Sequence, residues 1–149
     1  MKNHHQLKRL TSVIAFSLVT SFVLVTPTLA TIGIITKADL AGAWQMTLTG
    51  NTGCGLTSML VNVTLNSAGT GTNAVIKSHG QCGDGTATGQ TFTVLTMGAN
   101  GNGTANLSCG AGCGWNLNIQ VSPDRSTFNI VDVSPANPNN FIAGMAVHQ

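Results

Sequence analysis

The alternation of apolar and polar residues in short segments constrains this chain more than any other feature. In residues 114–121, Trp115, Leu117, Ile119 and Val121 form an apolar row, and glycine or amide side chains occupy the positions between them. Positions two apart lie on one face of a β-strand, so the pattern predicts a strand with one buried face. A helix needs apolar residues three and four positions apart, and no convincing pattern of that kind follows residue 30.

Similar segments recur as far as residue 147, separated by turns rich in Gly, Asn and Ser. Gly98–Asn102 is predicted to be a hairpin turn, because Gly and Asn adopt positive φ at low cost. The Gly-rich stretch from His79 to Gln90 is predicted to be a loop. The predicted strands are 43–49, 59–66, 70–78, 91–97, 103–109, 114–121, 127–133 and 141–147.

Eight consecutive strands with short links predict an antiparallel up-and-down sheet. Closing that sheet into a barrel buries its single apolar face and removes exposed edges. The opposite face carries Asn, Thr, Gln and Ser, whereas an outer-membrane barrel is apolar outside and has aromatic girdles. We therefore expect an all-β, eight-stranded β-barrel that is not an integral membrane barrel, with a two-sheet β-sandwich as the alternative.

The first thirty residues have the order of a secretory signal peptide. Lys2, Lys8 and Arg9 precede an apolar run over residues 10–25, and small residues at Thr28 and Ala30 follow Pro27. This order predicts cleavage after residue 30, one barrel domain over residues 31–149, and a secreted or periplasmic location. The alternative is an uncleaved anchor, but the apolar run is short for a membrane span.

Charge is scarce in the predicted domain. Its ionised side chains are three basic (Lys37, Lys77, Arg125) and four acidic (Asp39, Asp84, Asp124, Asp132), a net charge of −1. Nucleic-acid binding through the phosphate backbone needs clustered Lys and Arg, so it is excluded. The domain contains no Glu, and no Ser-His-Asp order, G-x-S-x-G, H-E-x-x-H or phosphate-loop motif occurs. We expect a protein that is not an enzyme and has no cofactor.

The segment Gly42-Ala43-Trp44 opens the first predicted strand with a G-x-W motif. This motif and the strand count resemble lipocalins and avidin-like proteins, which are eight-stranded up-and-down barrels that hold small ligands. Gly114-Trp115 at the start of a later strand also looks like avidin-type chains. The resemblance implies a calycin-type barrel in which Trp44 closes one end. It does not imply biotin, because the chain has no Tyr.

The predicted interior is rich in aromatic and Met side chains, which suggests a module that binds a small apolar ligand. A barrel of eight strands is just wide enough either to be packed or to hold one ligand. The candidate ligand-binding residues are Trp44, Trp115, Phe92, Phe128, His79 and Asp84, the last two as neighbours in the predicted loop. Other predicted interior residues are Met46, Met59 and the row Phe141, Ala143, Met145 and Val147.

The alternative function is a structural or interaction protein of the cell envelope or extracellular matrix. The polar, uncharged strand faces of the predicted barrel allow association without electrostatic repulsion. The partner would then be a second copy or another envelope protein.

Cys54, Cys82, Cys109 and Cys113 are predicted to form two disulfides, as is usual in a small exported domain. Cys54 lies in the link between the first and second predicted strands, and Cys82 lies in the link between the third and fourth. Cys109 and Cys113 flank the link between the fifth and sixth, and these three links share one end of an up-and-down barrel. The favoured pairing is Cys54–Cys82 with Cys109–Cys113; the rival is Cys82–Cys109 with Cys54–Cys113. A four-cysteine zinc site is disfavoured, because paired C-x-x-C motifs are absent, and we expect no metal.

Peptide mapping without reduction tests the disulfide pairing. We expect one fragment that joins Cys54 to Cys82, a bond worth about 3–4 kcal/mol on the chain-entropy model. The short Cys109–Cys113 ring should mainly shape the rim beside Trp115. A fragment that joins Cys82 to Cys109 would contradict the pairing, and four free thiols would restore the metal site.

Overall fold

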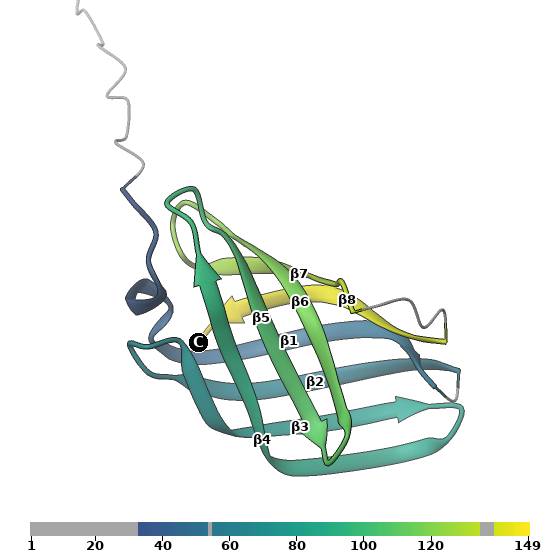
Figure 1. Cartoon of the computed structure of the whole chain (residues 1–149). Helices are drawn as coiled ribbons and strands as arrows, with labels where there is room; N and C mark the ends of the chain where they lie inside the picture. Colours follow the sequence, from purple (N-terminus) through teal and green to yellow (C-terminus); the bar gives the residue numbers. More distant parts are fainter. Residues whose placement is uncertain (1–32, 54, 135–138) are drawn as a thin grey trace, which may run out of the picture. The chain divides into compact units, whose positions relative to one another are not determined.

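Each strand pairs antiparallel with the next strand along the chain, and the last pairs with the first, so the sheet closes into a barrel. The computed structural model describes residues 33–53, 55–134 and 139–149 (Figure 1). A short 3₁₀ helix, η1 (Lys37–Leu40), precedes the strands. The strands are β1 (Gly42–Thr52), β2 (Leu56–Leu65), β3 (Thr70–Gly80), β4 (Gly83–Met97), β5 (Asn102–Gly110), β6 (Cys113–Val121), β7 (Thr127–Asp132) and β8 (Asn140–His148).

This architecture confirms the all-β, eight-stranded up-and-down barrel, and the two-sheet sandwich is wrong. The predicted signal peptide, residues 1–30, lies outside the described residues and stays a prediction. No helix in the described ranges has the length and apolar character needed to cross a membrane.

The loop predicted from His79 to Gln90 is wrong, because most of it continues the β3–β4 hairpin. His79 pairs with Asp84, and Gly80 pairs with Gly83, so only two residues form the turn between the strands. Glycine has no side chain to mark a strand, but its backbone still makes the ladder hydrogen bonds. Gly89 has φ +67° and lies close to a register shift between the strands, where the ladder is irregular.

The predicted alternation sets which side chains are buried. Leu117 and Ile119 are buried in the core, whereas Asn116 and Asn118 are exposed. Val61 and Val63 on β2 are likewise buried. A period of two places every second side chain inside the barrel, so the core is one apolar column with contributions from all eight strands.

The prediction of which side chains of β8 face inward is wrong. Ile142 and Ala146 face the core, whereas Phe141, Met145 and Val147 are 50%, 44% and 42% exposed. Both rows of this strand are apolar, so alternation alone does not distinguish inside from outside. The register decides: Gly144, in the inward row, pairs with the buried Leu48, and a Cβ there would collide with the backbone of β1.

The N-terminal segment closes one end of the barrel. Ile35 and Leu40 are buried, and the Ile35 amide donates a hydrogen bond to the Ala99 carbonyl at 3.1 Å, in the β4–β5 turn. The indole Nε1 of Trp44 donates to the Leu40 carbonyl at 2.8 Å. The ring centroid of Trp44 lies 4.7 Å from that of Phe128. Trp44 therefore lies beneath η1 in the closed end, the position that the G-x-W resemblance implies.

An ion pair ties η1 to the β6–β7 turn. Asp39 Oδ2 accepts hydrogen bonds from the amide and the hydroxyl of Thr36, both at 2.8 Å. Asp39 Oδ1 lies 3.1 Å from Arg125 Nε. The hydrogen bonds from Thr36, with a smaller effect from Arg125, lower the pKa of Asp39.

Asp124 organises the same β6–β7 turn. Its carboxylate accepts hydrogen bonds from the Ser122 hydroxyl at 2.5 Å and the Ser126 hydroxyl at 2.8 Å. These bonds lower the pKa of Asp124 to about 2. Arg125 follows with φ +62°, a left-handed conformation that turns the chain back and costs a non-Gly residue about 1–2 kcal/mol.

Substituting Ile119 with Ala should destabilise the barrel by about 2–5 kcal/mol, because it leaves a cavity in the core. Asn118→Ser, on the outer face of the same strand, should change the free energy of unfolding by no more than about 0.5 kcal/mol. Urea unfolding of both variants measures the difference. Similar effects at the two positions would contradict the assignment of faces.

Lowering the pH should destabilise the fold from about pH 4 downward, toward pH 2. The pKa values of Asp39 and Asp124 are lower in the folded chain than in the unfolded chain. The unfolded state therefore binds more protons in this window, and the stability present above it is lost as the pH falls. Urea unfolding at a series of pH values should show a shallower acid slope for the Asp39→Asn, Asp124→Asn double variant. An unchanged slope would assign the loss to other groups.

Candidate functional site

The opposite end of the barrel, here called the mouth, contains a cavity of about 330 Å³. Strands β1, β3, β5 and β7 end at the mouth, and the strands that follow them begin there (Figure 1). The apolar walls of the cavity are Met59, Ile76, Ala87 and Trp115. These side chains belong to the inward rows of β2, β3, β4 and β6, so the cavity is the part of the barrel interior at the mouth that side chains leave unfilled.

Uncharged polar groups line the rest of the mouth cavity. The indole Nε1 of Trp115 donates a hydrogen bond to Asn140 Oδ1 at 2.9 Å, which fixes the ring against β8. The hydroxyls of Thr52 and Thr57 lie 3.0 Å apart, and Thr57 is buried. Ser78 adds a third hydroxyl, and no described lining residue carries a charge. The cavity can thus hydrogen-bond a neutral ligand while it surrounds it with apolar surface.

A disulfide between Cys109 and Cys113 borders the mouth cavity, with the two Cα atoms 5.1 Å apart. Gly110 and Gly112 within the ring have φ values of +128° and +73°, which other residues rarely adopt. This bond confirms one half of the favoured pairing and contradicts a Cys82–Cys109 bond. Cys82 follows β3 and lies in the link at the mouth end, as predicted.

The predicted Cys54–Cys82 bond involves Cys54, which lies outside the described residues, so this bond stays a prediction. In the described part of the chain, no group of three or more His, Cys, Asp or Glu residues is arranged to hold a metal ion.

The aromatic residues predicted to bind a ligand occupy two different places. Trp115 lines the mouth cavity. Trp44, Phe92 and Phe128 are buried, and the Phe92 and Phe128 ring centroids are 6.0 Å apart. This second group fills the interior toward the closed end and does not line the cavity.

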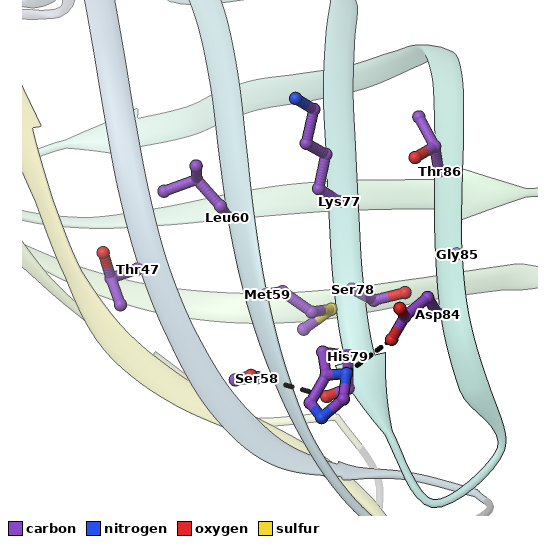
Figure 2. Close-up of a pocket in the computed structure, with 10 residues that line it drawn as sticks. All are labelled: Thr47, Ser58, Met59, Leu60, Lys77, Ser78, His79, Asp84, Gly85 and Thr86. Carbon is purple, nitrogen blue, oxygen red and sulfur yellow. Dashed lines mark hydrogen bonds and ion pairs between the residues drawn. The ribbon is translucent and has the colours of Figure 1, made fainter.

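His79 and Asp84 lie on the outer face of the barrel, as Figure 2 shows. His79 Nδ1 is 2.5 Å from Asp84 Oδ1, and both side chains are 81% exposed. They border a shallow depression that Lys77 and Thr86 also line. Pairs this exposed contribute at most about 1 kcal/mol, and water screens the field they create. The two residues lie opposite each other on paired strands and not in the predicted loop.

Ser58 completes a cross-strand row with this pair, since it is opposite His79 in the register. Its hydroxyl donates a hydrogen bond to the His79 carbonyl oxygen at 3.4 Å, not to the imidazole ring (Figure 2). A nucleophilic serine needs a hydrogen bond to the base that removes its proton. The row therefore has the residue types of a hydrolase site without its geometry.

Sequence reasoning missed the polar residues of the cavity. Thr57 is two positions before Met59 and therefore shares its inward row, which extended alternation could have shown. Thr52 and Asn140 are the end residues of β1 and β8, where the boundaries of a strand are hardest to predict.

No protein-family model matches this chain, and no curated protein matches it.

Proposed function

We propose that this protein binds a small, neutral, largely apolar molecule in the mouth cavity. The observation that carries the proposal is the difference between the two ends of the barrel. One end is closed by η1 and Trp44, whereas the other contains about 330 Å³ of space lined by apolar side chains and a few hydroxyl and amide groups. Pockets for small molecules have this composition, and this volume is near the lower end of their range.

The walls favour an apolar ligand for a simple energetic reason. Each square ångström of apolar surface removed from water contributes about 25 cal/mol. Met59, Ile76 and Trp115 offer such surface already arranged around the space. The bond from Trp115 to Asn140 holds the indole in place, so binding costs little side-chain entropy there.

The polar groups favour a neutral ligand. A charged ligand would lose hydration and find no opposite charge among the described lining residues, which is costly. A single hydroxyl or carbonyl on the ligand could instead bond with Thr52, Thr57 or Asn140. The cavity contains no acid–base pair in these residues, which supports a binding role over catalysis.

The resemblance to lipocalins and avidin-like proteins supports the same role, because the barrels of those families hold small ligands. The disulfide at the mouth and the predicted signal peptide support it as well, because both suit a secreted or periplasmic carrier or scavenger.

Titration with the neutral fluorophore N-phenylnaphthylamine tests this proposal. We expect saturable energy transfer from tryptophan to one bound probe. Ala87→Leu should weaken binding about tenfold or more, since the larger side chain takes up the space. Thr88→Leu is the control, because Thr88 is exposed on the same strand.

Thermal unfolding should first show that both variants keep the fold. Equal affinity in the Ala87→Leu and Thr88→Leu variants would place the probe outside the cavity. No saturable binding across a panel of neutral apolar compounds would overturn the proposal.

A further inference from the structure

The outer surface of β7 and β8 carries an apolar patch, here called the β7–β8 face. It consists of Val131, Val133, Phe141, Met145 and Val147, which are 54%, 48%, 50%, 44% and 42% exposed. Single exposed apolar residues are common on soluble proteins and need no explanation. Four large ones on two adjacent strands, with Val133 directly after β7, form a patch, and such patches mark interaction surfaces.

The register makes this face continuous. Val131 is opposite the exposed Ala143, and Met145 lies two positions farther along β8 on the same side. The outward residues of the neighbouring strands are uncharged: Asn118 on β6 is opposite Val131, and Thr47 on β1 is opposite Met145. On β7, Asn129 is opposite Met145 and Thr127 is opposite Val147. The face is therefore an apolar row along β8, joined by Val131 and Val133 near the mouth, with an amide and hydroxyl border.

We propose that a second copy of this chain binds the β7–β8 face, so that two barrels associate sheet to sheet. The absence of charge favours this occupant. Two copies of an acidic or basic surface would repel each other, but this face has no ionised side chain among its residues or at the border positions just named. Each copy offers the other an identical apolar centre, which an isologous dimer requires.

The other occupants fit less well. An anionic lipid surface attracts clustered basic residues. The described basic side chains are Lys37 on η1, Lys77 on β3 and Arg125 in the β6–β7 turn, so they are scattered and none is on the face. A strongly charged protein partner would have no opposite charge to meet.

The size of the face predicts a weak dimer. The outward row of β8 spans about 20 Å, and β6, β7, β8 and β1 together are about 15–20 Å wide. Contact over this surface buries about 400 Å² per copy, or about 800 Å² in total, below the range of stable complexes. We therefore expect a reversible dimer that forms at micromolar or higher concentration.

Sedimentation equilibrium of the oxidised protein, from micromolar to millimolar concentration, tests the proposal. The wild-type chain should show a monomer–dimer equilibrium. Phe141→Lys and Met145→Lys should each raise the dissociation constant about tenfold or more, because each puts a charge into the apolar contact. Both side chains are about half exposed, so the substitutions leave the core intact.

Leu95→Lys is the matched control. Leu95 is an apolar residue with 48% exposure on β4, which is four strands away from β8 on either side of the barrel. The Leu95→Lys substitution should leave the dissociation constant of the dimer within about twofold of the wild-type value. Binding of N-phenylnaphthylamine to the monomeric variants should be unchanged, since the mouth cavity is a separate site.

Three results would overturn the dimer. A strict monomer at every concentration would show that the face has another occupant or none. An undiminished dimer in the Phe141→Lys and Met145→Lys variants would place the contact elsewhere. An equal loss in the Leu95→Lys variant would mean that added charge, and not this face, controls association.

Discussion

Closure of the sheet is the constraint on which the rest of this structure depends. The pairing of β1 with β8 runs over nine positions, from Trp44–His148 to Thr52–Asn140. Gly50 and Gly144 permit this pairing, because a Cβ at either position would collide with the backbone of the other strand. Once β1 and β8 are joined, every strand pairs with a strand on either side, and each strand has one inner and one outer row.

Closure also gives the barrel two ends with different chemistry. Trp44 and Leu40 complete the core at the closed end, where the N-terminal segment covers it. At the mouth, the inward rows finish in threonine, serine and asparagine, and in a disulfide, which do not fill the space. The cavity thus exists because the large inward side chains do not continue as far as the mouth. On β6, Trp115 is the large inward residue nearest to the mouth.

The residues predict the barrel well because β6 alternates strictly and β2 departs from alternation only at Leu56 and Leu60, and one such strand fixes the inward row of its neighbours through the register. The residues of β8 do not predict which of its faces is buried, because neighbouring residues such as Phe141 and Ile142 are both apolar. The extension of the β3–β4 hairpin through residues 79–90 was missed because glycines carry no side-chain signal. The cavity depends on Thr52 and Asn140 meeting across the closure, which local sequence patterns cannot show.

The scarcity of charge links the two proposed surfaces. Hydrogen bonds between uncharged side chains, such as Gln45 to Asn62 at 3.1 Å and Thr96 with Thr104 at 2.7 Å, join neighbouring strands on the outer faces. Salt screens interactions between exposed charges. Binding in a neutral cavity and association through an uncharged face therefore depend little on ionic strength. Selectivity must then come from shape and from the few fixed hydrogen-bonding groups, such as the Trp115–Asn140 pair.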